Sequence, residues 1–170
     1  MFKKIVIIAL VSTLAVGCAS IPMESLERTT TAKKFNPPAE GNSGLYIYRN
    51  SLGAFHYRDV RVNEQCIGST APYVFFYEEV EGGKSYKVST ESEFSPNDLL
   101  IKVKSGMHYF IKQNMVFWDV GVELVDEEQG KEEVSKLDMA AQGTCRPRST
   151  LGDELHNIQS IGTSLGGLLW

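Results

Sequence analysis

A cysteine at position 18 closes an apolar stretch at the amino terminus, and its thiol lies directly after the place where a signal sequence would be cut. Lys3 and Lys4 supply a charged start, a predominantly apolar run follows, and Gly17 is the small residue before the cysteine. This order is typical of a secretory signal. The apolar run is shorter than the ~20 residues that cross a bilayer, which disfavours a membrane-spanning helix. We therefore predict that residues 1–17 are a signal peptide.

The segment LAVGC at positions 14–18 resembles the lipobox of bacterial lipoproteins. That resemblance implies lipid attachment at Cys18, with acyl chains whose buried methylenes each contribute ~0.8 kcal/mol to membrane binding. Ala19 and Ser20 follow, without the acidic residue that signals inner-membrane retention in lipoproteins of enteric bacteria. We expect an outer-membrane protein that faces the periplasm, anchored to the membrane by its acyl chains. A secreted protein without lipid is the alternative.

With Cys18 assigned to lipid, Cys66 and Cys145 are the two cysteines left in the mature chain. Because compartments outside the cytoplasm oxidise thiols, we predict a disulfide between them. It would close a loop of about 80 residues and contribute ~4 kcal/mol in the chain-entropy model. Two unpaired thiols are the alternative. Neither cysteine has a second cysteine or a histidine at metal-ligand spacing, so no zinc site is expected.

The three histidines, His56, His108 and His156, fall in a loop, at a strand start and in the tail. The sequence has no Gly-x-Ser-x-Gly, His-Glu-x-x-His, phosphate-binding glycine loop or Cys-His motif. We predict no catalytic residues, no cofactor and no metal, and we interpret His108 as a strand-end residue with a hydrogen-bonded ring. Because triads can assemble in space without a sequence motif, an envelope hydrolase stays as the least favoured alternative.

Charge and length limit the partners and the size of the domain. The 170-residue chain has 17 Lys and Arg and 21 Asp and Glu; without Lys3 and Lys4 the mature chain has 15 basic residues against 21 acidic ones, a net charge of −6. An acidic chain without a basic cluster is not expected to bind nucleic acid. The length fits one domain of about 100 residues with a single core.

Residues 18–43 are rich in Ser, Thr, Lys, Asn and Pro, and Pro37-Pro38 disfavours a helix, so we expect a flexible tether with Phe35 at the domain edge. Residues 44–141 show short alternating runs between turn residues. They predict an all-β domain, a small antiparallel β-sandwich of seven or eight strands. The glycine-containing turns at 81–84 and 104–106 are each expected to close a hairpin. Strands are expected near residues 45–48, 57–62, 66–67, 73–80, 86–90, 99–103, 109–111 and 120–125.

Residues 127–141 lose the alternation and predict a short helix after the last strand. Glu132 and Lys136 have the favourable i,i+4 spacing, and Val134 and Leu137 share one side. The acidic residues at its start lack the ligand spacing of an EF-hand loop. We interpret them as a solvated helix start, stabilised by the helix dipole.

Residues 142–170 form a C-terminal tail in which we predict a short amphipathic helix. Its apolar face either packs on the sandwich or contacts a partner or the membrane. Phe75 and Phe76 are consecutive and must point to opposite faces of a strand. We expect the tail to cover the outer one; left uncovered, these aromatics would form a binding surface. The candidate contact residues of the tail are Leu151, Leu155, Ile158, Ile161 and Trp170.

Four segments carry a family resemblance, and they occur in a fixed order. They are GLYIYRN at 44–50, VRVNEQCIGSTAPYVFFYEEVEGGKSYKV at 60–88, SGMHYFIKQ at 105–113 and VELVDEEQGKEEV at 122–134. Together they resemble the bacterial lipoproteins grouped as domain of unknown function 2846, over roughly residues 30–140. The resemblance implies a compact β-sandwich on a lipoprotein tether, without an assigned activity. Cys66 is not expected of the family, so the disulfide is particular to this chain.

These observations favour a non-enzymatic envelope lipoprotein that binds another envelope component or supports an assembly. The expected partner is an envelope protein. A glycan- or peptide-binding module that uses exposed aromatics is the alternative. A pocket around a histidine would favour the hydrolase, an exposed aromatic strip the ligand module, and an uncovered apolar tail the assembly component.

Overall fold

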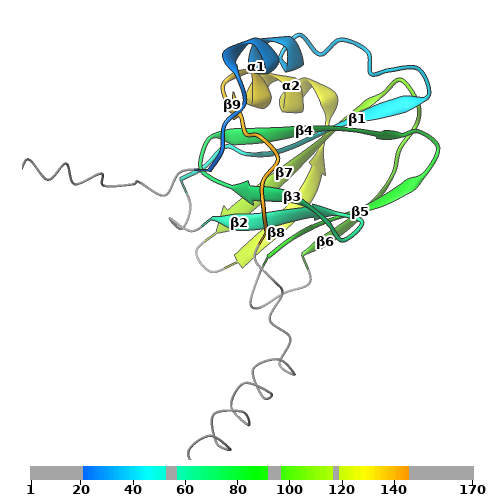
Figure 1. Cartoon of the computed structure of the whole chain (residues 1–170). Helices are drawn as coiled ribbons and strands as arrows, with labels where there is room; N and C mark the ends of the chain where they lie inside the picture. The colour runs from blue at the N-terminus through cyan, green and yellow to red at the C-terminus, as the bar shows by residue number, and fades with distance from the viewer. Residues whose placement is uncertain (1–20, 53–56, 92–96, 117–118, 146–170) are drawn as a thin grey trace, which may run out of the picture.

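The computed structural model describes residues 21–52, 57–91, 97–116 and 119–145 (Figure 1). Two short helices and nine strands lie in these ranges. The helices are α1 (Leu26–Ala32) and α2 (Glu127–Ser135), and the strands are β1 (Asn42–Arg49), β2 (Arg58–Val62), β3 (Gln65–Thr70), β4 (Val74–Glu81), β5 (Ser85–Thr90), β6 (Asp98–Lys102), β7 (His108–Val116), β8 (Asp119–Val125) and β9 (Asp138–Met139).

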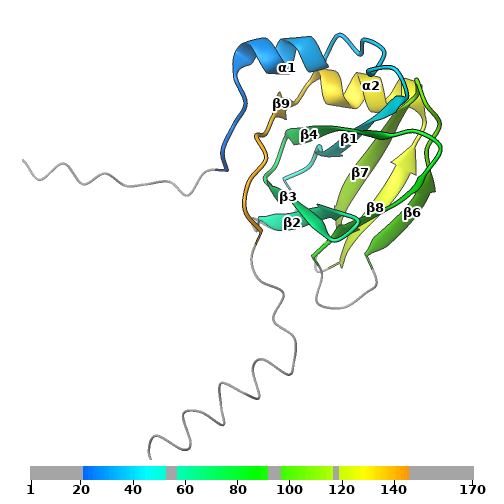
Figure 2. The same cartoon turned by 45° about the vertical axis from the view of Figure 1, so that its right-hand side comes forward.

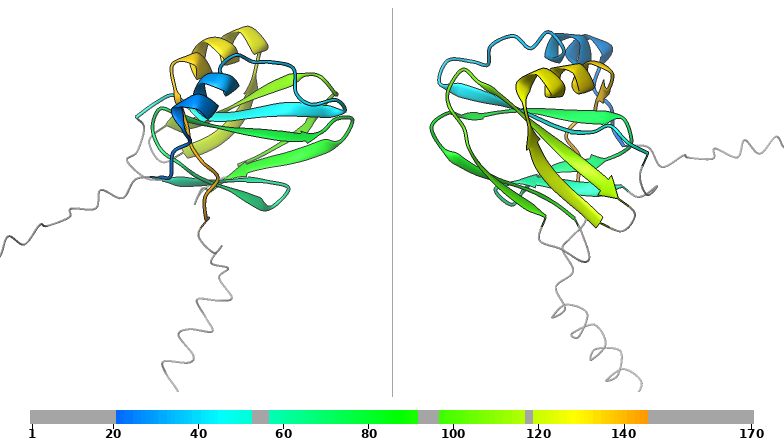
Figure 3. Two further views of the ribbon diagram at one scale, coloured as in Figure 1. Left: turned by 45° about the horizontal axis from the view of Figure 1, so that its top comes forward. Right: turned by 180° about the vertical axis from the view of Figure 1, so that it is seen from behind.

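The strands form two sheets, and the helices add a third layer. The five-stranded sheet has the order β8-β7-β1-β4-β9, and the four-stranded sheet has the order β3-β2-β5-β6. The two sheets face each other, and both helices lie on the outer side of the five-stranded sheet (Figures 1 and 3). The expected all-β sandwich is therefore confirmed, with β9 as a two-residue addition to the predicted strands.

The sequence analysis expected purely antiparallel sheets, but two of the strand pairs are parallel. Strand β1 pairs with β7 in parallel, and β4 pairs with β9 in parallel. The prediction that the turns at 81–84 and 104–106 close hairpins was also wrong. The turn at 81–84 leads from β4 in one sheet to β5 in the other, and the turn at 104–106 leads from β6 back to β7.

Both turns are held by hydrogen bonds to neighbouring segments instead of closing a strand pair. The Gly82 N–H donates to the Gly41 carbonyl at 2.8 Å, and the Gly83 N–H donates to the Val103 carbonyl at 2.8 Å. The Gly106 N–H donates to the Asn42 carbonyl at 2.7 Å. These hydrogen bonds join three segments at this end of the sandwich: the start of β1, the turn at 81–84 and the turn at 104–106.

The turn between β2 and β3 closes a true hairpin. Asn63 and Glu64 have positive φ values of 47° and 66°. Two consecutive left-handed residues are the signature of a type I′ turn, whose twist matches that of the paired strands. The turn lies between the strands expected near residues 57–62 and 66–67.

The main core fills the space between the two sheets. It also contains one polar connection, because the buried Gln113 of β7 accepts a hydrogen bond from Thr70 and donates one to Thr90. Both threonines belong to the opposite sheet, so these bonds satisfy the buried amide and join the layers. The apolar members include Leu45, Ile47, Val60, Ile67, Val74, Phe76, Val88, Ile101 and Ile111.

A second cluster, rich in aromatic residues, covers the outer face of the five-stranded sheet. Phe76 lies in the main core and Phe75 in this outer cluster, so their predicted opposite orientation is confirmed. Among the described residues, Val134 of α2, Leu137 and Met139 lie in the same cluster as Phe75, and Ala32 and Phe35 pack against it. Residues 146–170, the part of the tail that was expected to cover this face, lie outside the described residues. The buried members are Tyr46, Tyr48, Phe75, Phe110, Val134, Leu137 and Met139.

Residues 21–43 belong to the domain, so the expected tether from residue 18 to residue 43 was wrong over this range. Helix α1 starts at its N-cap Ser25, whose side chain accepts a hydrogen bond from the Arg28 N–H, and it ends well before Pro37. Phe35 packs its ring against Tyr46, with the ring centroids 5.3 Å apart. Three consecutive threonines hide this helix in the sequence, because β-branched residues have low helix propensity.

Helix α2 follows β8 as predicted, but it ends at Ser135 because the chain then turns into β9. Asp126 caps its first turn, and the predicted pair of Lys136 with Glu132 is present at 2.7 Å. No helix in the described ranges is both long and apolar enough to span a membrane.

A partly buried ion pair ties α2 to the sheet beneath it. Glu133 accepts hydrogen bonds from the Tyr48 hydroxyl at 2.5 Å and from Lys112 Nζ at 3.0 Å. Burial favours a higher pKa for Glu133, but these hydrogen bonds outweigh it and hold the pKa below 4.5. The carboxylate therefore stays charged and keeps both partners in place at neutral pH.

After β9 the chain continues as a strap along one edge of the sandwich (Figure 2). The Gly143 N–H donates to the Ile67 carbonyl of β3 at 2.9 Å. Cys145 then forms the predicted disulfide with Cys66, with the Cα atoms 5.8 Å apart. The strap thus connects β9 of one sheet to β3 of the other.

We predict that Gly130→Ala destabilises the protein, although the same change normally stabilises a helix by about 1 kcal/mol. A Cβ atom at residue 130 would lie 2.1 Å from Cγ of the buried Phe110. The free energy of unfolding should fall by about 1–3 kcal/mol, as for other overpacked cores. Denaturant unfolding measures this. Gly121→Ala, where nothing lies within 4 Å of the added Cβ, is the control and should change it by less than about 0.5 kcal/mol.

We predict that the double variant C66S/C145S loses about 4 kcal/mol of unfolding free energy, because the disulfide spans 79 positions of the chain. Dithiothreitol should lower the wild-type protein to the same value and leave the variant unchanged. An equal stability of oxidised wild type and variant would contradict a structural role for this bond.

Candidate functional site

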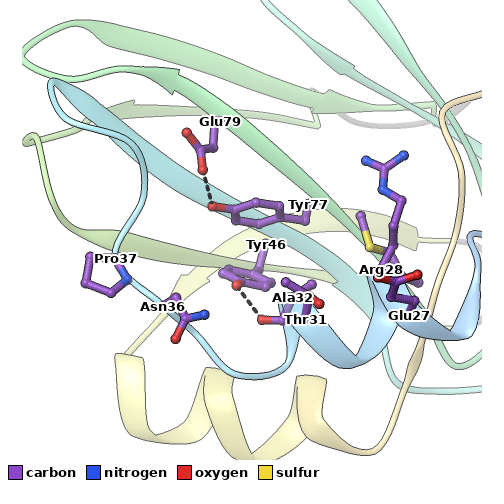
Figure 4. Close-up of a pocket in the computed structure, with 10 residues that line it drawn as sticks. Glu27, Arg28, Thr31, Ala32, Asn36, Pro37, Tyr46, Tyr77 and Glu79 are labelled. Atoms are coloured by element: carbon purple, nitrogen blue, oxygen red, sulfur yellow. Dashed lines mark hydrogen bonds between the residues drawn. The ribbon is translucent and has the colours of Figure 1, made fainter.

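A pocket of about 310 Å³ lies between helix α1 and the outer face of the five-stranded sheet (Figure 4). We call it the α1 pocket. Its floor comes from β1 and β4, and its rim comes from α1 and the segment that follows it. The lining residues are Glu27, Arg28, Thr31, Ala32, Asn36, Pro37, Tyr46, Tyr77, Glu79 and Met139.

Two tyrosine rings form the floor of the α1 pocket. Tyr46 of β1 and Tyr77 of β4 face each other across the strand pair, with their ring centroids 4.7 Å apart. The Tyr46 hydroxyl donates to the Ala32 carbonyl at 2.8 Å, at the end of α1 (Figure 4). This bond fixes the helix end above the floor.

Glu79 sits at one end of the pocket and organises the loop beside it. One carboxylate oxygen accepts a hydrogen bond from the Tyr77 hydroxyl at 2.9 Å. The other accepts from the Ala39 N–H at 3.1 Å and from Asn42 Nδ2 at 3.2 Å. The side chain therefore connects β4 to the chain that enters β1.

The ionisable groups of the floor are held in one protonation state. Burial, then the hydrogen bond to Glu79, raises the pKa of Tyr77, and burial raises the pKa of Tyr46 in the same direction. Desolvation favours a higher pKa for Glu79, but the hydrogen bonds from Asn42, Tyr77 and Ala39 outweigh it, so the pKa lies below 4.5. General acid–base catalysis works best with a pKa near the working pH. These groups suit binding better than proton transfer.

The rim of the pocket is more acidic than basic. Arg28 is the basic side chain of the lining, and its Nη1 atom lies 2.6 Å from the carboxylate of Glu24. Glu27 and Glu79 are the acidic side chains of the lining. Aromatic faces and carboxylates both attract cations. The pocket therefore favours a neutral or positively charged group.

His108 lies beside the pocket but does not line it. Its ring meets Tyr46 edge-on at 5.4 Å and lies against Gly44, where a Cβ would be 2.5 Å from the ring. Burial, then the charge of Lys131, lowers its pKa, against a backbone hydrogen bond with Asn36. Its Nε2 atom is buried without a partner among the described residues, so the expected fully hydrogen-bonded ring is wrong at this atom.

The structure describes only part of the residues that the sequence analysis singled out. It brings Cys66 and Cys145 together. The residues that lie outside the described ranges are Cys18, His56, His156 and the tail residues Leu151, Leu155, Ile158, Ile161 and Trp170. Lipidation of Cys18 and partner binding by the tail remain predictions.

Phe75 and Phe76 do not form the strip of exposed aromatics that the sequence analysis gave as the alternative. Phe75 and Phe76 are 0% and 2% exposed, and Tyr73, just before the strand, is 48% exposed. In the described ranges, no three His, Cys, Asp or Glu side chains gather closely enough to hold a metal ion. The α1 pocket is thus the stronger candidate for ligand binding.

The sequence analysis missed the pocket, although one signal was present. In the run Leu45-Tyr46-Ile47-Tyr48 both alternating faces are apolar or aromatic, which indicates a strand that is covered on both sides. That signal predicts a covering element over Tyr46 and Tyr48. It does not identify residues 26–35 as the cover.

We predict that Glu79→Gln reduces stability at neutral pH and that the difference from wild type shrinks in acid. The folded pKa lies below the unfolded value of 4.5, so the contribution is present above that value and is lost as the pH falls through the folded pKa. Because Glu79 is largely exposed, the effect should be below about 1 kcal/mol. Denaturant unfolding from about pH 7 down to about pH 3 measures it.

Glu123→Gln, a change at an exposed residue on β8, is the matched control for this series. It should follow the wild-type curve at every pH. A Glu79→Gln curve parallel to the wild-type curve throughout would show that Glu79 is not the titrating group.

Comparisons with known proteins agree with the resemblance seen in the sequence. The family model described as "Protein of unknown function (DUF2846)" matches residues 39–124, which span β1 to β7 and most of β8. An "Uncharacterized protein" of Haemophilus influenzae is 47% identical over 135 residues, which cover 76% of this chain and 80% of that protein. No solved structure matches the chain. Since the family match covers half of the sequence and a relative of this identity covers more, the chain belongs to the DUF2846 family.

Proposed function

We propose that the protein is a non-enzymatic binding module of the bacterial cell envelope. It is anchored by lipid at Cys18 in the outer membrane, faces the periplasm, and binds another envelope component in the α1 pocket. The observation that carries the proposal is the pocket itself, because a concave site with an aromatic floor and a few fixed polar groups is the usual form of a ligand site.

The compartment is supported by two features. The first is the predicted signal peptide at residues 1–17, directly before Cys18. The second is the Cys66–Cys145 disulfide, because such bonds persist where thiols are oxidised. An oxidising, membrane-bound location satisfies both.

The ligand that fits the pocket best is an amino-bearing segment of an envelope protein or peptide. A cationic amino group would approach the Tyr77 ring and the carboxylates of Glu79 and Glu27. Arg28 competes weakly for the same position because Glu24 already neutralises it at 2.6 Å. The charge of the rim thus favours a lysine side chain or chain amino terminus over an anion.

We predict that a short lysine peptide shifts the NMR resonances of Tyr46 and Tyr77, and that acetylation of its lysine weakens binding about tenfold. Thr31→Trp should abolish binding because residue 31 lines the pocket. Thr30→Trp is the matched control, since Thr30 is the exposed neighbour on α1 and is not among the lining residues. Equal binding by both variants, or by both peptides, would contradict the proposal.

The tail is tested separately, by in-cell crosslinking of the full chain and of a chain that ends at Cys145. This end keeps the disulfide with Cys66, which an end at Gln142 would remove. Partners lost with the tail would assign docking to residues 146–170. Partners that persist in the shortened chain and in Thr30→Trp, but not in Thr31→Trp, would assign docking to the pocket.

A further inference from the structure

The lipid attachment site is separated from the folded domain by very few residues. Pro22 already belongs to the domain, because its carbonyl accepts a hydrogen bond from the Ala141 N–H at 2.9 Å. Met23 forms a β-bridge with Ala140, and the Glu24 N–H donates to the Met139 carbonyl at 2.9 Å. A fully extended chain from residue 18 to residue 22 spans about 14 Å at most. An acyl anchor at Cys18 would therefore hold the domain against the membrane.

Helix α1 starts four residues after Pro22, and its outward side is apolar at the same end. Leu26 is 81% exposed, the highest fraction among the exposed large hydrophobic residues described, and Met23 is 46% exposed. Met23 lies in the extended segment just before Ser25, the N-cap of the helix, so both exposed side chains are near the start of α1. The helix lies at the outside of the molecule, above the sheet (Figure 2). An exposed leucine close to an acyl anchor can bury its side chain in the apolar part of the bilayer.

The charge of this segment also differs from that of the rest of the chain. Between residues 22 and 34 there are three basic residues, Arg28, Lys33 and Lys34, and two acidic ones, Glu24 and Glu27. The segment thus has a net charge of +1, whereas the mature chain has 15 basic and 21 acidic residues and a net charge of −6. Anionic lipid headgroups would therefore repel the mature chain as a whole but not this segment.

We propose that the start of α1, with Leu26 and the preceding Met23 at its centre, rests on the lipid surface and fixes the orientation of the domain on the membrane. The inference depends on the acylation of Cys18 in the proposed function. Leu26 inserts between headgroups, as apolar residues of interfacial helices do. Because Glu27, Arg28 and Thr31 of the same helix line the α1 pocket, the pocket then opens close to the membrane surface.

The test places a photocrosslinking amino acid at position 26 of the full acylated chain, reconstituted in vesicles of phosphatidylethanolamine and phosphatidylglycerol. The matched control places it at position 100, where Leu100 of β6 is 73% exposed on the opposite sheet. We expect lipid adducts at position 26 to exceed those at position 100 several-fold.

A second variant inserts a flexible Gly-Ser segment of about twelve residues between Ser20 and Ile21, which frees the domain from the anchor. Adducts at position 26 should then decrease towards the level of position 100, while intact mass shows unchanged acylation. Acylated protein with equal lipid adducts at both positions overturns the inference and leaves the anchor in place. A mass without acyl chains overturns the inference together with the lipid anchor of the proposed function.

Discussion

The burial of strand β1 on both faces is the constraint on which the rest of this fold depends. Leu45 and Ile47 point into the space between the sheets, and Tyr46 and Tyr48 point to the other side, where the helices lie. A strand in the middle of a two-layer sandwich would leave its outer side chains in water. Here that face is aromatic, so a third layer has to cover it.

The covering layer uses different contacts at its two ends. Helix α2 approaches so closely that Gly130 touches Phe110, and Glu133 is fixed by Tyr48 and Lys112. Helix α1 is held at its end by the hydrogen bond from Tyr46 to Ala32 and leaves the α1 pocket beside it. A tight contact on one side and a looser one on the other thus create a cavity over the same sheet.

Much of this arrangement could be predicted from the sequence, because some signals are local. The turn at Asn63 and Glu64, the helix start at Asp126 and the pairing of Cys66 with Cys145 follow from turn chemistry, capping and cysteine number. The path between the sheets could not. Alternation assigns a side chain to a face of its strand. A glycine turn such as the one at residues 82–83, however, can either close a hairpin or lead from one sheet to the other, and its sequence does not distinguish the two. The α1 pocket escaped prediction because it needs residues 26–37 beside strands β1 and β4, which no local pattern connects.

Strand β9 and the strap that follows it, residues 138–145, have a further consequence for how the protein behaves before its disulfide forms. Strand β4 would be an edge strand without β9, and Gly143 bonds to the outer side of β3 at Ile67. Unpaired strand edges are templates on which other chains add and aggregate. The bond from Cys145 to Cys66 holds this edge cover in place. Molecules whose cysteines are still reduced would thus be most prone to self-association, and the disulfide protects the solubility of the protein as well as its stability.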